Sequence, residues 1–262
     1  MADSAWWGEF SFDLEQQRRW RLGERSIVLK RLENEWNSWN FEVREESDVV
    51  AVDCDVVADE LAIEDVYGRH LQHNTADKVN ILPLLADRSV VARPATPLTL
   101  LAGEKSRLFV STPIWFYAET LPNRARLLDL PFWRPSDSWF GPSTRHGQLC
   151  YAKYTSARIQ LTHLERRAHR AITPITVVNN HNKPLTIERI NVPVTLLHLF
   201  SDDSYQLWTT AITVRREDNY DDVRLVLDKD APKEAQDAKL ISRPREVIDE
   251  GALIRSISSL FA

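Results

Sequence analysis

The sequence predicts an all-β protein: two β-sandwich-like units of immunoglobulin type packed together, followed by a short C-terminal amphipathic helix. Three observations lead to this expectation. Residues 18–43 alternate apolar and polar side chains, residues 88–119 hold short runs of branched and aromatic residues, and residues 158–227 hold further strand candidates. Short strands at regular spacing, separated by turn residues, are typical of sandwiches and barrels.

The first strands are predicted from the pattern around the N-terminal tryptophans. Apolar residues alternate from Trp20 to Leu29 on both sides of a polar turn at Gly23-Glu24, and they alternate again from Trp39 to Val43. An alternation with a period of two predicts antiparallel strands with one buried face and one face in solvent.

The middle of the chain is divided into strands by proline and glycine. Pro94, Pro97, Gly103 and Pro113 interrupt runs rich in valine, leucine and isoleucine. Proline cannot donate to a strand ladder, so these residues indicate turns between strands of four to six residues.

The second half contains a predicted hairpin and the predicted helix. The segment NNHNKP at 179–184 combines asparagine, which tolerates left-handed backbone, with a proline that stops a strand, so its flanks are expected to pair. Apolar residues recur at helical spacing from Leu253 to Phe261, which predicts an amphipathic helix over 250–262. A helix this short is marginal alone, so we expect it to pack on the protein body or on a second copy.

The chain has 262 residues, which is enough for two domains. Eight of the nine tryptophans precede residue 140. We therefore expect a Trp-rich β domain over 1–145, an immunoglobulin-like β-sandwich over 146–232, and a linker with the C-terminal helix over 233–262.

Composition restricts the partners and the compartment. A net charge of −5 leaves no broad basic surface for a nucleic-acid backbone. The opening residues MADSAWWGEF lack the basic and apolar regions of a secretory signal, and no window approaches the ~20 apolar residues of a membrane span. We therefore expect a cytoplasmic protein in which Cys54 and Cys150 are free thiols.

An acidic segment resembles a calcium loop only superficially. Asp53 and Asp55 have the spacing of calcium ligands, but Val57 and Ala58 occupy the positions that require an oxygen ligand and a glycine. The sequence also contains no phosphate-binding loop, dinucleotide fingerprint or HExxH motif. We expect neither a metal nor a cofactor.

The stretch from Leu130 to Ala152, LPFWRPSDSWFGPSTRHGQLCYA, is the best candidate for a site. It has neither helical nor strand periodicity, and its prolines and large rings predict a stiff loop between two β-rich halves. The candidate ligand-binding side chains are Arg134, Ser136, Asp137, Trp139, Arg145 and His146.

Three interpretations of this loop remain open. In the first it is structural, with Trp133 and Trp139 fixing it to the core. In the second, the segment from Ser136 to His146 supplies the nucleophile and base of a hydrolase, although the GxSxG turn that usually holds a nucleophilic serine is missing. In the third, its arginines bind a carboxylate or a phosphate through their planar guanidinium groups.

Several motifs resemble one family. The segments WWGEF, RRWRLG, VSTPIWF, FWRPSDSWFGPSTRHGQLCYA and SISSLFA together are similar to an uncharacterised prokaryotic family, domain of unknown function 432. The resemblance covers almost the whole chain and implies no activity, ligand or catalytic residue. Some archaeal members of this family are encoded beside small mechanosensitive channels.

The leading functional hypothesis is a non-enzymatic binding or interaction module that contacts another protein or a second copy of itself. The first alternative is a hydrolase that uses the loop from Ser136 to His146. The second alternative is a soluble regulator that docks on a membrane protein. No catalytic residue is assigned.

Overall fold

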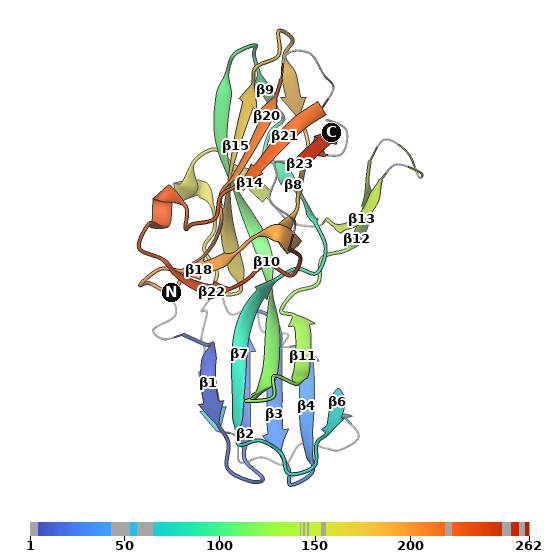
Figure 1. Ribbon diagram of the computed structural model, residues 1–262, viewed down its shortest axis with the longest axis vertical. Helices are drawn as coiled ribbons and strands as arrows, with labels where there is room; N and C mark the ends of the chain where they lie inside the picture. Colours follow the sequence, from blue (N-terminus) through green and yellow to red (C-terminus); the bar gives the residue numbers. More distant parts are fainter. Residues whose placement is uncertain are drawn as a thin grey trace. The chain divides into compact units, whose positions relative to one another are not determined.

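The computed structural model describes residues 5–42, 53–56, 65–141, 143, 145, 147–152, 156–217, 222–247, 253–256 and 260–261 (Figure 1). Within these residues the regular elements are β-strands and a few 3-10 turns, and none of the elements is an α-helix. The all-β class that the sequence predicts is therefore confirmed.

The strands of the N-terminal half are β1 (Gly8–Ser11), β2 (Gln17–Leu22), β3 (Arg25–Arg31), β4 (Glu35–Glu42), β5 (Asp53–Val56), β6 (Gly68–Leu71), β7 (Lys78–Leu85), β8 (Val90–Pro94), β9 (Leu98–Leu100), β10 (Lys105–Leu121) and β11 (Arg126–Pro131). The next elements are β12 (Asp137–Phe140), β13 (Gln148–Tyr151), β14 (Ser156–Arg158), η2 (Leu161–His163), β15 (Arg170–Asn179), β16 (Leu185–Ile187), β17 (Ile190–Val192) and η3 (Val194–Leu196). The last elements are β18 (Leu199–Ser201), β19 (Leu207–Thr209), β20 (Ile212–Arg216), β21 (Asp222–Leu227), η4 (Lys233–Ala235), β22 (Lys239–Ser242) and β23 (Leu253–Ser256).

The chain forms two compact units that are both discontinuous in sequence. The first contains Met1–Leu84 and Ile114–Trp133, and the second contains Leu85–Pro113 and Arg134–Ala262. Both are discontinuous because the long strand β10 contributes residues to each. These units are not the contiguous segments, 1–145 and 146–232, that the sequence predicts. Composition along a sequence does not reveal that one strand contributes residues to two units.

In the first unit, one sheet has the strand order β5-β2-β3-β4-β6. Trp20 pairs with Ile27 across β2 and β3, and Val28 pairs with Trp39 across β3 and β4. The β2–β3 turn contains Gly23 at a φ of 54°, a left-handed backbone conformation that glycine adopts without strain. The antiparallel pairing predicted from alternation is confirmed for these strands.

The other sheet of the first unit consists of β1, β7, β10 and β11. Strand β7 pairs with both β1 and β10, and β11 pairs with β10. Every second residue of β7 is buried, as a strand with one face on a core requires. Asn80 Nδ2 donates a hydrogen bond of 3.2 Å to Glu119 Oε1, which adds a side-chain link between β7 and β10.

Aromatic rings from both sheets form the core of the first unit. Trp20 in β2 contacts Phe116 in β10, with ring centroids 5.4 Å apart. Trp6 stacks on Phe116 at 6.0 Å and meets Phe132 edge to face at 4.9 Å. Trp6, Trp20 and Phe116 are all 0% exposed, so this Trp/aromatic cluster lies fully buried in the core of the first unit.

In the second unit, β10 pairs with β14 and with β15, antiparallel in both cases. Strand β15 runs parallel to β19 and β20, and the ladder continues from β20 through β21 to β23. Strand β8 pairs with β13, β14 and β17. One buried cluster of this unit consists of Phe109, Leu164, Ile172, Phe200, Trp208 and Ala235.

The predicted hairpin across residues 179–184 is wrong. Strand β15 pairs with β10, and β16 pairs with β9, so the two flanks of the turn do not pair with each other. The Asn179 amide donates to the carbonyl oxygens of Leu101 and Lys183, which fixes the turn and joins it to the chain that follows β9. The turn residues identify a turn but do not determine which strand is the partner.

The predicted C-terminal helix is wrong for Leu253–Ser256, which form strand β23. This strand pairs antiparallel with β21, where Ile254 lies opposite Arg224. An open strand edge offers backbone hydrogen bonds to the whole segment, whereas an isolated helix of this length is marginal. Leu260 and Phe261 are buried, and the rest of 250–262 lies outside the described residues.

Candidate functional site

The predicted site loop contains a β-hairpin. Strands β12 and β13 pair antiparallel, and β13 pairs in turn with β8 through Tyr151 and Val90. Strand β12 therefore lies at an edge of the sheet (Figure 1). An edge strand has backbone N–H and C=O groups that are available for pairing with another chain.

The hairpin exposes two apolar side chains side by side. Trp139 is 44% exposed and Leu149 is 48% exposed. The two residues are cross-strand partners, so their side chains lie on the same face of the hairpin. The prediction that Trp139 fixes the loop to the core is wrong: the neighbouring residue, Phe140, is buried and packs with Val91 and Cys150.

The exposed indole is held in one orientation. Trp139 Nε1 donates a hydrogen bond of 3.1 Å to the carbonyl oxygen of Ser143. The ring also lies against Gly147, where an added Cβ would overlap the indole and approach the Phe140 carbonyl oxygen to 2.7 Å. The exposed ring thus packs against the backbone of Gly147, where any larger residue would force the indole or the Phe140 carbonyl to move.

Charged side chains surround the base of the hairpin. Asp137 accepts hydrogen bonds from Arg88 at 3.2 Å and from Arg134 at 3.4 Å. These ion pairs are partly exposed and contribute little to stability. The Arg88 guanidinium also lies 5.4 Å from the centroid of the Tyr151 ring. Burial, followed by a hydrogen bond to Asp87, raises the pKa of Tyr151, so this phenol is neutral at pH 7.

The buried face of the hairpin contains Cys150, a free thiol. Burial raises the pKa of this thiol to about 11, because the thiolate would lose its hydration, and a backbone hydrogen bond from Phe140 opposes the shift. The thiol is therefore protonated at neutral pH, and its role is packing rather than nucleophilic chemistry.

The structure places five of the six predicted site residues. Arg134, Ser136, Asp137, Trp139 and Arg145 are exposed, on β12 or on the segments beside it. His146, the base of the hydrolase alternative, lies outside the described residues. Asp137 is directed to two arginines, and Ser143 Oγ accepts a hydrogen bond from the Arg145 amide at 3.3 Å. These described side chains of the loop thus lie at the surface of the protein.

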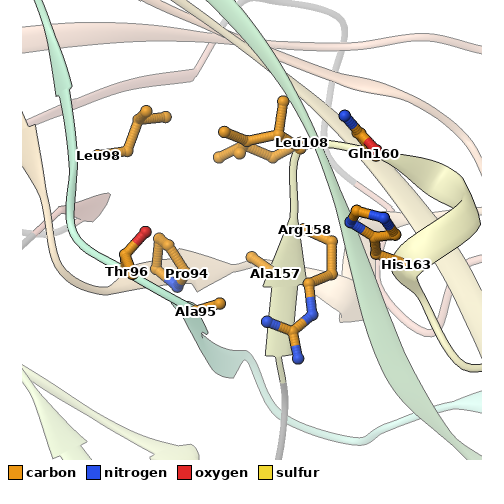
Figure 2. A pocket seen from close by; sticks show the side chains of 10 residues that line it. Pro94, Ala95, Thr96, Leu98, Leu108, Ala157, Arg158, Gln160 and His163 are labelled. Atoms are coloured by element: carbon orange, nitrogen blue, oxygen red, sulfur yellow. The ribbon is translucent and has the colours of Figure 1, made fainter.

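Sequence reasoning missed a pocket in the second unit, which has a volume of about 280 Å³ (Figure 2). Its lining residues are Pro94, Ala95, Thr96, Leu98, Leu108, Ala157, Arg158, Ile159, Gln160 and His163. They come from the end of β8 and the turn to β9, from β9, from β10, from β14, and from the segment after β14 through η2. The segments are distant in sequence and share no motif, so no local signal pointed to the pocket.

Metal binding and membrane insertion each require a particular arrangement of residues. Among the described side chains, no group of three or more histidine, cysteine, aspartate or glutamate residues has an arrangement that would hold a metal ion. The part of the chain that the structure describes has no helix with the length and apolarity needed to cross a bilayer.

The geometry thus defines a nearly all-β protein with an exposed aromatic hairpin in its second unit. The family model described as "Protein of unknown function (DUF432)" matches residues 6–261, so the chain belongs to this family. The match confirms the resemblance inferred from the tryptophan-rich motifs. Comparisons with curated proteins and with solved structures find no match.

Proposed function

We propose that the protein is a non-enzymatic interaction module whose hairpin, β12 and β13, binds an extended acidic segment of a partner protein. The observation that carries this proposal is the exposed Trp139, which is fixed in place by Gly147 and by its hydrogen bond to Ser143. A large ring that is exposed yet ordered loses little conformational freedom on binding, and tryptophan is enriched among interface residues that dominate affinity.

The position of the ring favours a partner in an extended conformation. Strand β12 is an edge, so a segment of another chain can add to it through backbone hydrogen bonds. In such a complex every second side chain of the added strand lies on the face of Trp139 and Leu149. Apolar residues at alternate positions of the partner would cover this pair.

The charges near the hairpin favour an acidic partner. Arg134 and Arg145 are exposed, and Arg88 is partly exposed. Two carboxylates lie beside these three arginines: Asp137 accepts hydrogen bonds from Arg88 and Arg134, and Asp87 accepts one from Tyr151. A carboxylate on the partner would pair with an arginine and also increase the rate of association.

Selection from a phage-displayed library of random peptides tests the proposal. On the full-length protein, we expect enrichment of peptides with apolar residues at alternate positions and at least one Asp or Glu. The affinity of these peptides for Trp139→Ala should fall by about 30-fold or more, the loss typical of a dominant interface residue.

Leu240→Ala is the matched control, because Leu240 is 50% exposed on another strand of the same unit. Its affinity for the selected peptides should equal that of the wild type. Peptides that bind Trp139→Ala as tightly as the wild type would refute the role of the hairpin. Light scattering tests the alternative partner. If the wild type is a dimer and Trp139→Ala is a monomer, the partner of the hairpin is a second copy of the chain and not a peptide segment of another protein.

Three finer predictions accompany this proposal. An immunoglobulin-type sandwich is proposed for the second unit, supported by antiparallel pairs such as β10–β15 and β20–β21 and by an apolar cluster. Cytoplasmic localisation stays a prediction from the sequence. The partner that supplies the acidic segment is, in a second form of the proposal, a membrane protein.

A further inference from the structure

We propose that the pocket between β8, β9, β10 and β14 binds a small amphipathic anion: a carboxylate with an aliphatic or aromatic tail of about ten non-hydrogen atoms in total. The size follows from the volume of about 280 Å³, which corresponds to roughly nine water molecules at ~30 Å³ each. This site uses none of the hairpin residues, so it is independent of the interaction proposed above.

Apolar side chains form the base of the pocket. Leu108 is buried on β10, Ala157 is buried on β14, and Leu98 is half-buried on β9. Ile159 lines the same pocket and is 59% exposed, although isoleucine is usually buried. An apolar tail in the pocket would cover this side chain and remove it from water.

The polar side of the pocket is held by the 3-10 turn η2. Leu164 belongs to the buried cluster around Phe109 and Trp208, and Leu161 packs against that cluster. These contacts anchor η2 and leave His163 exposed at the pocket. Figure 2 shows Gln160 and His163 together on one side, across from Leu98 and Thr96, with Arg158 extending between the two sides.

The charge of the lining selects an anion. Arg158 and His163 are basic, Gln160 and Thr96 supply neutral polar groups, and the lining contains no acidic residue. No hydrogen bond or ion pair joins the Arg158 or His163 side chain to another described residue. A guanidinium that has no partner among the described residues and lines an apolar cavity is suited to hold a carboxylate through two hydrogen bonds.

Phenylacetate is the probe, because it has ten non-hydrogen atoms, a ring and a carboxylate. We expect saturable amide shifts in the NMR spectrum of the full-length, isotope-labelled protein, confined to residues 95, 96, 98, 108 and 157–163. The dissociation constant should lie between about 10 μM and 1 mM, the range for a ligand of this size. Phenylacetamide, which has the same shape without the charge, should bind at least about tenfold more weakly.

Variants separate the two parts of the site. Arg158→Gln should weaken phenylacetate binding at least about tenfold, and Thr96→Trp should abolish it by filling the pocket from an exposed position. Arg166→Gln removes an exposed arginine outside the lining and should leave the affinity unchanged. Equal binding of the carboxylate and the amide, equal binding by Arg158→Gln, or the absence of saturable shifts would each overturn the proposal.

Discussion

Trp20→Ala is expected to lower the free energy of unfolding by about 3–5 kcal/mol, because it removes a large ring from the centre of the aromatic core. Trp20 is 0% exposed, and its ring contacts Phe10 and Phe116, each with centroids 5.4 Å apart. The substitution would leave a cavity between the two sheets of the first unit. It would also remove the 3.1 Å hydrogen bond from Trp20 Nε1 to the Trp6 carbonyl oxygen, which is buried.

Urea unfolding followed by far-ultraviolet circular dichroism measures this loss. Trp20→Phe is the matched variant: it restores an aromatic ring but not the indole N–H, so its loss should be smaller than that of the alanine variant. If Trp20→Ala unfolds at the same urea concentration as the wild type, the aromatic cluster does not hold the two sheets together.

Asn179→Ala is expected to lower the free energy of unfolding by about 3 kcal/mol. Asn179 is 0% exposed at the end of β15. Its Nδ2 donates to the carbonyl oxygens of Leu100, Leu101 and Lys183 at 3.1, 3.1 and 2.9 Å. Alanine leaves these acceptors without the donor that joins the turn after β15 to the chain after β9.

Asn180→Ala tests whether this effect is specific to the buried amide. The Asn180 side chain is exposed and donates to Glu217 at 3.2 Å, so its removal should cost less than about 1 kcal/mol. Asn179→Asp keeps the shape but loses the amide donor and places an acidic group against carbonyl oxygens, so it should be at least as unstable as Asn179→Ala. An aspartate variant as stable as the wild type would show that the three hydrogen bonds are not the cause.

The parts of the fold that are local in sequence could be predicted. Strands β2 and β3 follow from the alternation around Trp20 and Ile27, because side chains on a strand point to opposite faces in turn. The partner of β16 and the pairing of β23 could not be predicted. Both depend on which strand edges are open in the folded chain, and the local pattern contains no information about distant edges.

The same distinction between local and non-local features holds for the candidate site. The unusual composition of 130–152 belongs to a segment whose described residues include exposed polar and aromatic side chains. The predicted role of Trp139 as a core anchor is wrong, because β12 exposes Trp139 and buries the adjacent Phe140. Which face of an edge strand meets the core depends on its register with β13, and composition does not determine that register.

The proposed function requires that the Trp139 ring be available for binding and not be needed for folding. Equilibrium unfolding of Trp139→Ala, compared with the adjacent variant Phe140→Ala, tests it most directly. We predict that Trp139→Ala stays within about 1 kcal/mol of the wild type, because its ring is 44% exposed, whereas Phe140→Ala, at 2% exposure, loses about 3–5 kcal/mol. A loss for Trp139→Ala as large as that for Phe140→Ala would contradict the claim, because it would make the ring part of the core.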